Sequence, residues 1–455
     1  MILKTFSRQF ATIIAVVTAL NVAASENLSF ENHESTTVGI FVKEIATGKV
    51  LVQENAMLSL TPASVTKTVT SATALLNLGT DFRFATTVAL SGKRSTANPQ
   101  RWEGDLVIYA SGDPTIGSNE FDSTKYFSTP IIEGVKRLNI TEITGGVVVV
   151  DTLRDAGPLP TWECEDIAWP YGAGFFGFNY CGNVVKVYPN RGITEQATHL
   201  KIVTTPTDER SYDVLRGINS NELLVKVPAS QRGKATWAIN ATNPDPAYTY
   251  TKALAQKLRN AGIRINEKPV SEGVPEATTV VHINYSPTAA EICQSLMKRS
   301  DNLFAEGMLR AIDPEGSRKD CLKALKDFWK DKGLRTSSII MHDGSGLTRS
   351  NRFSPVFLAA MLEHMAKSPL ADTYVQCFPL AGIDGTLKNF GSRTILRGRI
   401  ALKTGSLSSV QTYAGYHLDA DHKPTHVIVV MVNGFTCPRR QVQAAIEKFL
   451  IDLFK

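Results

Sequence analysis

The chain has 455 residues, a length that predicts two or three domains rather than one. Its composition, 43% hydrophobic and 20% charged, is that of an ordinary globular protein and excludes a disordered or fibrous chain. The formal net charge of +6 is small for this length and no long basic run occurs, so nucleic acid is not an expected partner.

The N-terminal segment has the pattern of a signal peptide. Lys4 and Arg8 precede an uncharged, largely apolar run over 10–24 that ends in the small residues Ala23 and Ala24. A basic start, an apolar segment and a small-residue cleavage site are typical of secretory leaders, so residues 1–24 are expected to direct export. An uncleaved anchor is the alternative reading, and the absence of a nearby cysteine argues against a lipoprotein.

The expected export bears on whether the cysteines form disulfides. Six of them would allow up to three disulfides in an oxidising compartment, and the sequence does not select among the pairings. Cys164 with Cys181 is the preferred pair, because both lie in one segment rich in glycine and aromatic residues. No Cys-x-x-Cys spacing occurs, so no metal site and no cofactor are expected.

The first predicted elements are a hairpin and a helix. Strand-like residues 37–42 and 50–52 flank the turn 46–48. Pro62 favours a helix that begins just after it, apolar residues then recur with a period near 3.6, and Gly79 supplies a stop.

The middle of the chain is predicted to be β-rich, and helices return after it. Short strand-like segments separated by Gly, Pro, Asn and Asp lie at 85–90, 105–109, 145–151 and 200–205. Helical patterns lie at 248–261, 289–297, 303–310, 320–332, 355–367 and 439–454. Three further strands are predicted at 400–404, 409–418 and 425–433.

This order indicates one α/β unit interrupted by an insertion. We expect a catalytic domain built from 25–83 and 281–455, in which the first hairpin and helix are completed by the last helices and strands. The insertion is expected to hold a β-rich domain (84–109 and 183–280) and a second nested module (110–182).

The start of the first helix carries a candidate nucleophile. Ser64 and Lys67 stand one turn apart on the same helix face. A hydroxyl beside an amine can act as nucleophile and base once the amine has lost its proton, which burial and neighbouring cations favour. Alone, the pattern also fits a surface helix start with a serine cap and a solvated lysine.

Two tripeptides later in the chain favour the catalytic reading. Ser300-Asp301-Asn302 forms a tight connection between helices, and Lys403-Thr404-Gly405 follows a strand-like run. Ser-x-x-Lys, Ser-Asp-Asn and Lys-Thr-Gly in this order are the motif set of penicillin-binding proteins and class A β-lactamases.

With these motifs the chain resembles the serine D-alanyl-D-alanine peptidases. The long separation of Ser64 from Ser300 is similar to that in the class C low-molecular-mass penicillin-binding proteins, the penicillin-binding protein 4 type, which carry two nested modules there. Further similar segments lie at 111–114, 162–173, 343–347 and 381–387, so that the resemblance covers nearly the whole exported chain. The chain departs from the usual pattern at Ser406, where threonine is common, and at Thr66, where a larger residue is common.

The resemblance implies a fold and an activity. The fold is α/β of the β-lactamase/transpeptidase type, an antiparallel sheet flanked by helices, with nested β-rich modules. The activity is that of a serine-type D-Ala-D-Ala carboxypeptidase or DD-endopeptidase that cuts peptidoglycan stem peptides through an acyl-enzyme. The chain is then an exported, periplasmic enzyme with β-lactam antibiotics as covalent inhibitors, while peripheral membrane association and the oligomeric state stay open.

The resemblance also implies residue roles. Ser64 attacks, Lys67 accepts its proton, Ser300 relays a proton to the leaving nitrogen, Asn302 binds the substrate amide, and Lys403 adds positive charge. Thr404, Gly405 and Ser406 line the place of the terminal carboxylate, and the backbone N–H groups of Ser64 and Ser406 hold the oxyanion.

Two residues of the insertion are further candidates. Asp166 and Tyr171 fall where the family places residues facing the diamino-acid side chain of the stem peptide; the alternative is a surface aspartate beside a core aromatic. Asp113 and Asp343 are expected to shape a turn and a loop.

Two other functions are weighed. A β-lactamase needs a carboxylate that activates the deacylating water, and no such residue can be assigned. A weakly active cell-wall scaffold has no need of Lys67 and Lys403 together.

Overall fold

The computed structural model describes residues 28–455 except residue 272, so the predicted signal peptide lies outside the described residues. The chain forms two compact units. The first holds the described residues up to Gly79 together with Cys293–Asp301 and Lys319–Lys455, and the second holds Thr80–Ile292 and Asn302–Arg318.

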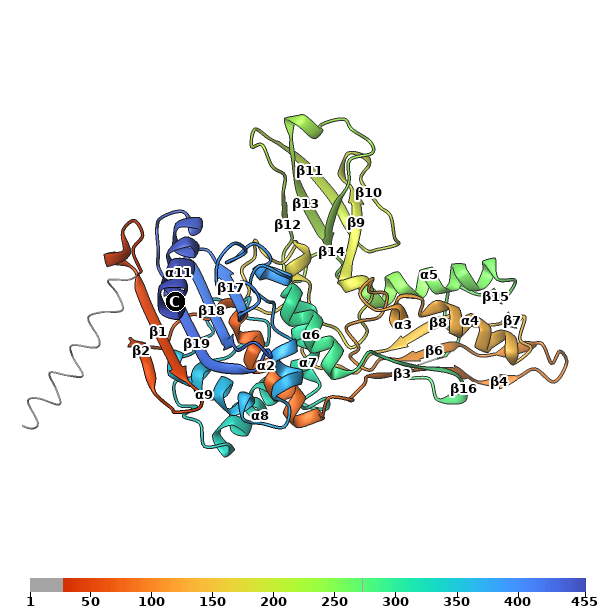
Figure 1. The fold of residues 1–455 in the computed structure, drawn as a ribbon. Helices are drawn as coiled ribbons and strands as arrows, with labels where there is room; N and C mark the ends of the chain where they lie inside the picture. The colour runs from red at the N-terminus through yellow and green to blue at the C-terminus, as the bar shows by residue number, and fades with distance from the viewer. Residues whose placement is uncertain (1–27, 272) are drawn as a thin grey trace, which may run out of the picture. The chain divides into compact units, whose positions relative to one another are not determined.

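The first unit is built on a five-stranded antiparallel sheet with the order β17-β18-β19-β1-β2 (Figure 1). The strands are β1 (Thr37–Glu44), β2 (Val50–Glu54), β17 (Ile400–Leu407), β18 (Val410–Leu418) and β19 (Pro424–Asn433). β1 pairs with β19 from Thr37–Asn433 to Glu44–His426, which joins the two ends of the chain. The predicted N-terminal hairpin and C-terminal strands are confirmed.

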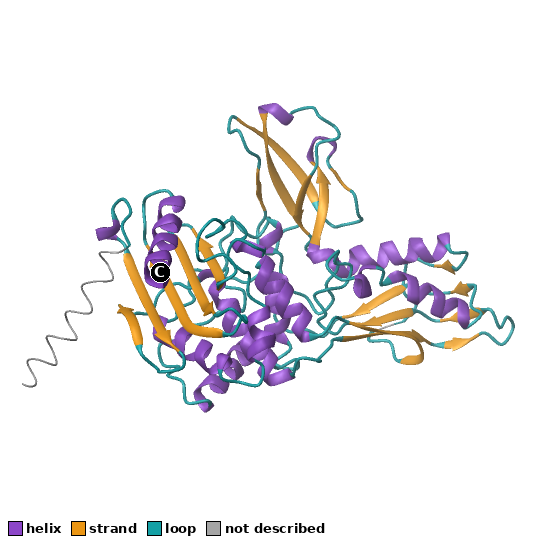
Figure 2. Ribbon diagram, in the orientation of Figure 1, coloured by secondary structure: helices purple, strands orange, loops and turns teal. Residues whose placement is uncertain are grey.

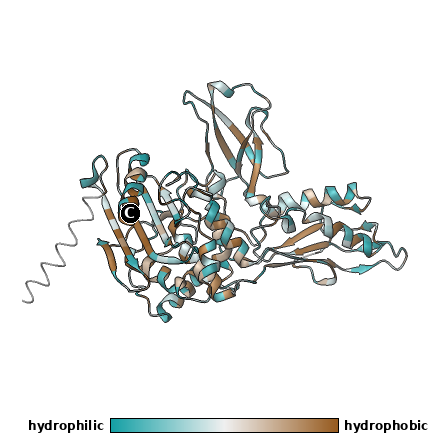
Figure 3. Cartoon of the chain, viewed as in Figure 1, coloured by the Kyte–Doolittle hydropathy of each residue, from teal (hydrophilic) through white to brown (hydrophobic). Residues whose placement is uncertain are grey.

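Helices cover both faces of this sheet. The helices of the first unit are α2 (Thr66–Leu78), α6 (Ala289–Arg299, shared with the second unit), α8 (Arg318–Asp331), α9 (Pro355–Ala366), α10 (Ala371–Gln376) and α11 (Arg439–Phe454). The inner side of α11, including Val442, Ile446 and Phe449, packs on Ile40 and Val430 of the sheet. Strand β19 is accordingly apolar over much of its length (Figure 3), because a sheet covered on both faces must bury both sets of side chains.

The helix α2 is buried on every side, because Thr66 and each residue after it up to Leu75 are inaccessible to solvent. A short 3-10 turn, Ala63–Val65, precedes α2, and Gly79 ends it with a φ of 86°. Glycine adopts this left-handed conformation without strain, so the predicted helix end is confirmed.

The second unit contains two separate cores. One lies in the four-stranded sheet β16-β3-β6-β8 and the helices α4 and α5, and the other lies in the small sheets β10-β9-β14 and β11-β13-β12 (Figure 2). The larger strands are β3 (Ala85–Ser91), β6 (Leu106–Tyr109), β8 (Val147–Val150), β9 (Val184–Tyr188), β11 (Lys201–Thr207), β12 (Asp213–Leu215), β13 (Glu222–Pro228), β14 (Ile239–Thr242) and β16 (Ala277–Tyr285). The short strands are β4 (Lys93–Arg94), β5 (Arg101–Glu103), β7 (Glu142–Ile143), β10 (Ile193–Thr194) and β15 (Arg264–Ile265). The helices are α3 (Asp122–Lys125), α4 (Ser128–Arg137), α5 (Pro246–Asn260) and α7 (Asn302–Arg310).

These cores group the residues differently from the division predicted from the sequence. Strands β3 and β6 share their core with α4 and α5, whereas the segment from β9 to β14 has a core of its own. Residues 281–292 and 302–318, predicted to be catalytic-domain residues, belong to the second unit. For residues 281–285 the reason is that β16 pairs with β3 along its length, a contact between distant segments that local patterns do not encode. No described helix is long and apolar enough to cross a membrane.

Candidate active site

Ser64 lies in the 3-10 turn that leads into α2. Its neighbour Ala63 has a φ of 49°, in the left-handed region that non-glycine residues rarely adopt. Such strain persists only where the surroundings fix it, and it is frequent at functional sites. Here it holds a half-buried serine at the start of a buried helix.

Lys67 is fully buried one turn along the chain. Its Nζ lies 3.0 Å from Ser64 Oγ and donates a second hydrogen bond to the Ser345 carbonyl at 2.6 Å. The amine is therefore aimed at the hydroxyl, as the Ser-x-x-Lys spacing predicts.

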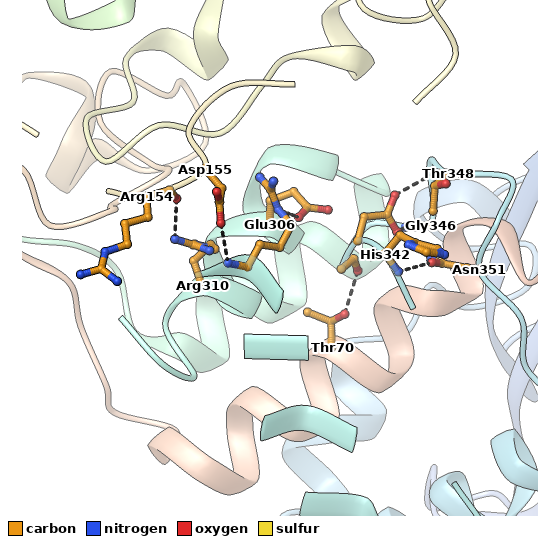
Figure 4. Close-up of polar contacts among 12 residues, drawn as sticks. Thr70, Arg154, Asp155, Glu306, Arg310, His342, Gly346, Thr348 and Asn351 are labelled. Atoms are coloured by element: carbon orange, nitrogen blue, oxygen red, sulfur yellow. Dashed lines mark hydrogen bonds and ion pairs between the residues drawn. The ribbon is translucent and has the colours of Figure 1, made fainter. Parts of the chain in front are cut away.

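The loop that holds Lys67 is shaped by Asp343, and Figure 4 labels three residues of this loop that bond to it, Gly346, Thr348 and Asn351. The carboxylate of Asp343 accepts hydrogen bonds from Gly346 N, Thr348 N and Asn351 Nδ2 at 2.7–2.8 Å. Gly346 has a φ of 79°, and a Cβ there would stand 1.9 Å from the Ala63 carbonyl oxygen. The tight contact between this loop and the Ser64 turn requires glycine.

The edge strand β17 carries Lys403, a second buried lysine. Its Nζ donates to Ser300 Oγ at 2.9 Å and to the Thr404 carbonyl at 2.8 Å. Burial, and then the charge of Lys67, hold the pKa of Lys403 well below its ordinary value. Ser300 has a φ of 62°, a second strained position within the site.

The same strand runs directly past the nucleophile. A Cβ at Gly405 would lie 2.5 Å from the Pro62 carbonyl oxygen and 3.0 Å from Ser64 N. The Thr412 hydroxyl of β18 donates to that Pro62 carbonyl at 2.6 Å, which ties the sheet to the Ser64 turn. Glycine at 405 thus permits the close approach of β17.

The residues beside Gly405 present hydroxyl groups. Thr404 Oγ1 donates to Thr386 Oγ1 at 2.9 Å, and the exposed Ser406 donates to Gln411 Oε1 at 2.9 Å. Both hydroxyls lie on the strand where the resemblance places the substrate carboxylate.

The remaining candidates lie in the second unit. Tyr171 is 48% exposed and its hydroxyl donates to Asp166 Oδ1 at 2.8 Å. Burial and this bond to Asp166 raise the pKa of Tyr171. Asn302, at the start of α7, donates from Nδ2 to the Tyr171 carbonyl at 2.8 Å.

Three structural contributors were not identified from the sequence. They are the Ser345 carbonyl, which binds Lys67, the Gly346 position, which lets that loop approach Ala63, and the Thr412 hydroxyl, which binds Pro62. Asp343 shapes the loop of Ser345, as expected from the sequence. The segment 343–347 was noted as similar to the family, but no residue type marks in a sequence which backbone carbonyl will bind Lys67.

The predicted disulfide is wrong, because Cys164 and Cys181 are both free thiols. Cys164 is exposed on a loop, whereas the partly buried Cys181 has its Sγ 3.5 Å from the Gly117 carbonyl oxygen. Among residues 28–455 apart from 272, no cluster of three or more His, Cys, Asp or Glu side chains could hold a metal ion.

A Ser-x-x-Lys helix packed against an edge strand that carries Lys-Thr-Gly defines an active-site serine hydrolase of the penicillin-binding class. Residues 24–452 match the model of the D-Ala-D-Ala carboxypeptidase 3 (S13) family. The chain belongs to this family and is a serine-type peptidase, as the sequence predicts.

Individual relatives agree in sequence and fold. The D-alanyl-D-alanine carboxypeptidase DacB of Haemophilus influenzae is 26% identical over 430 residues, which cover 89% of this chain and 86% of that protein. A crystal structure of penicillin-binding protein 4 (dacB) from H. influenzae has a TM-score of 0.77 at 23% identity, covering 96% of this chain and 98% of that one. The same protein complexed with a β-lactam has a TM-score of 0.74 at 22% identity, covering 96% and 99%. The predicted fold class is confirmed.

Proposed function

We propose that the chain hydrolyses the peptide bond after D-alanine in peptidoglycan stem peptides, with Ser64 as the nucleophile. The observation that carries this proposal is the 3.0 Å approach of Lys67 Nζ to Ser64 Oγ, within hydrogen-bond reach for proton transfer. The attacking hydroxyl passes its proton to Lys67 as Ser64 Oγ bonds to the carbonyl carbon.

Lys403 supports this proton transfer electrostatically. Two buried ammonium groups repel each other, so the pair resists holding two protons, and one amine is free to act as the base. When the substrate's terminal carboxylate binds beside Thr404, Gly405 and Ser406, it favours a proton on Lys403 and leaves Lys67 as the neutral base.

The edge strand supplies the substrate's binding surface. β17 pairs on one side with β18 and ends the described sheet on the other, so its backbone groups are able to bind an extended peptide. The backbone N–H groups of Ser64 and Ser406 receive the oxyanion, and losing one such donor typically costs about 2.7–4 kcal/mol of transition-state stabilisation.

The leaving amine takes its proton through Ser300. The Ser300 hydroxyl accepts a hydrogen bond from Lys403. As the C–N bond breaks, Ser300 relays to the leaving nitrogen the proton that Lys67 took from Ser64. Asn302 binds the substrate amide, and the Asp166–Tyr171 pair binds the free amine of the diamino acid. Water then releases the acyl group from Ser64.

The same chemistry explains the proposed inhibitor and location. β-Lactams acylate Ser64 and leave slowly, because no carboxylate is assigned to activate the deacylating water. Export through residues 1–24 places the enzyme in the periplasm with its polymer substrate.

The test is benzylpenicillin labelling followed by digestion of purified muropeptides. We expect a mass increase on Ser64 that persists, and none in Ser64→Ala; Ser59→Ala, an exposed serine bonded to the Ser338 carbonyl, serves as the matched control. Free D-alanine among the products identifies a carboxypeptidase, and separated cross-linked dimers identify an endopeptidase. Rapid penicillin turnover would instead make the chain a β-lactamase, and unchanged peptide release by Ser64→Ala would refute the proposal.

A further inference from the structure

The second unit contains a cavity that the proposed chemistry does not use. Its volume is about 670 Å³, in the range of small-molecule sites. The walls come from the loop 155–167, the segment 216–221 and single residues around them, all within the second unit. Apolar surface is contributed by Trp162, Ile167 and Phe176, and polar groups by the segment 219–221 and by the carboxylate of Asp155, whose Oδ2 accepts the backbone N–H of Arg318.

Arg216 is the informative residue of this cavity. It follows strand β12 and is only 5% exposed. Nη1 donates to the Ser220 carbonyl at 3.2 Å and Nη2 to Thr242 Oγ1 at 3.1 Å, both neutral acceptors, while Nε has no partner. Within the described residues no carboxylate forms an ion pair with Arg216, and burial lowers its pKa.

A second arginine, Arg318, lines the same cavity at 7% exposure. Its Nε lies 3.8 Å from Glu306 Oε2, too far for a hydrogen bond, and neither Nε nor Nη2 has an acceptor. Its backbone N–H donates to Asp155 Oδ2 at 3.3 Å. The adjoining loop is anchored where Arg310 Nη2 donates to the Arg154 carbonyl at 2.9 Å (Figure 4).

A buried guanidinium without a counter-charge is unfavourable, because desolvation of the cation is not offset by an opposite charge. A carboxylate that enters the cavity would supply this charge and accept hydrogen bonds from the unused Nε–H of Arg216. The asparagine and serine side chains of 219–221 suit peptide amides, and the aromatic walls suit methyl and methylene groups. The cavity therefore has the chemistry of a site for a short acidic peptide.

We propose that Arg216 and Arg318 bind a carboxylate of a peptidoglycan stem peptide in this cavity, at a site separate from the groups that carry out hydrolysis. The choice of a stem peptide rests on the proposed function, whereas the carboxylate specificity rests on the arginines. The site would let the enzyme bind the anionic polymer through a stem peptide that it does not hydrolyse.

The binding test uses the tripeptide L-Ala-γ-D-Glu-meso-diaminopimelate, which lacks D-alanine and offers no bond to cut. Titration into the exported chain carrying Ser64→Ala is followed by calorimetry and by tryptophan fluorescence, with Trp162→Phe locating the signal in the cavity. We expect Arg216→Gln to weaken binding by about tenfold or more and Arg318→Gln to weaken it less. Arg191→Gln, which removes an exposed arginine of the same unit, should change it by less than about twofold.

The ligand side supplies an independent comparison that needs no protein variant. The same tripeptide with its carboxyl groups amidated should bind at least about tenfold more weakly. Equal binding of the two peptides, or equal effects of Arg216→Gln and Arg191→Gln, would overturn the proposal. Acetate that binds as tightly as the tripeptide would show a simple anion site and would overturn the peptide assignment. If Arg216→Gln does not fold, the proposal is tested by measuring how tightly Arg216→Lys binds the tripeptide and by comparing the tripeptide with its amidated form.

Measured rates of acylation and of product release distinguish this inference from the proposed function. Arg216→Gln should be acylated by benzylpenicillin at the wild-type rate but should release products several-fold more slowly from cross-linked peptidoglycan. A wild-type chain that is not acylated refutes the function proposed for Ser64, while its tripeptide binding still reports on the cavity. Wild-type rates of Arg216→Gln on both substrates would refute the role of the cavity in gripping the polymer.

Discussion

Lys67 and Lys403 place two amines out of contact with water in one site. Neither lysine is paired with a carboxylate in the hydrogen bonds described above, which run to Ser64, Ser300 and backbone carbonyls. Burial, and then the charge of Lys67, hold the pKa of Lys403 well below its ordinary value, so the pair resists holding two protons. This is the basis of the base role proposed for Lys67.

The pH dependence of acylation tests this coupling. Lys403→Ala removes the like charge, so Lys67 should keep its proton to a higher pH. The acid limb of the benzylpenicillin acylation rate should therefore move to higher pH, and the rate at pH 7 should fall by about 10²-fold or more. The acylation rates are measured by mass spectrometry from about pH 5 to about pH 10, a range that extends to both sides of neutral pH.

The control for this experiment is Lys49→Ala, which removes an exposed lysine of the same unit. Its acid limb should coincide with that of the wild type. An acid limb that stays in place in Lys403→Ala, with only the overall rate reduced, would show that Lys403 acts on substrate binding and not on the base.

Asp113 offers a second prediction from a single buried group. Burial raises its pKa to about 6, although its Oδ1 accepts bonds from Thr115 N and Oγ1, and its Oδ2 has no partner. The folded state therefore holds the proton more tightly than the unfolded state. Stability is fully present below about pH 4 and falls as the pH rises to about 6, by about 3 kcal/mol in all.

The variant Asp113→Asn should lose this part of the pH dependence. Urea unfolding at pH 4, 5, 6 and 7, points chosen to span the two pKa values, gives the free energy of unfolding for each chain. Asp122→Asn, at an exposed position, should follow the wild type. If the free energy of unfolding of Asp113→Asn falls with pH as steeply as that of the wild type, the pH dependence comes from other groups.

At the scale of the elements, β17 lies directly against the Ser64 turn, and both carry backbone N–H groups proposed to bind the oxyanion. Gly405→Ala would put a methyl group 2.2 Å from Thr412 Oγ1 and 2.5 Å from the Pro62 oxygen, so the strand must move away. We expect acylation to slow by about 10²-fold or more, since misplacing a donor costs several kcal/mol.

Gly217→Ala is the matched control for this substitution, because its added methyl group meets only Ser220 Cβ at 3.4 Å. Both variants are compared by acylation rate and thermal midpoint. Wild-type acylation by Gly405→Ala would mean that the close approach of the strand is not needed for catalysis.

Local patterns predicted the elements that carry the motifs. Pro62 and Gly79 bound the helix of Ser64, and alternation and turn residues located the C-terminal strands. Helix α4 was missed because Pro130 and Gly134 interrupt its helical pattern. Gly134 has a tertiary reason, since a Cβ there would stand 2.6 Å from the Val281 carbonyl oxygen. Such a reason appears only when distant segments meet.

The same limit applies to the site. Ser64, Lys67, Ser300 and Lys403 were picked out because each belongs to a short motif, and the structure brings Lys67 to Ser64 and Lys403 to Ser300. The Ser345 carbonyl and the Arg216 cavity were not predicted. A backbone carbonyl becomes a partner of Lys67, and an arginine becomes buried without an opposite charge, only when the chain folds.

For the whole molecule, the division into two units predicts how the protein melts. The candidate nucleophile, both buried lysines and their sheet lie in the first unit, while Asp113 lies in the second. Each unit has its own hydrophobic core, so each is able to unfold cooperatively by itself. Benzylpenicillin on Ser64 adds contacts to the native first unit, and Asp113→Asn changes only the second.

Differential scanning calorimetry at pH 7 should therefore show two transitions. Acylation should raise the midpoint of one of them, and Asp113→Asn should move the other, because its buried charge is removed. Ser64→Ala exposed to benzylpenicillin controls for effects that do not require acylation. A single transition that both treatments move would show that the two units unfold together and would contradict the prediction.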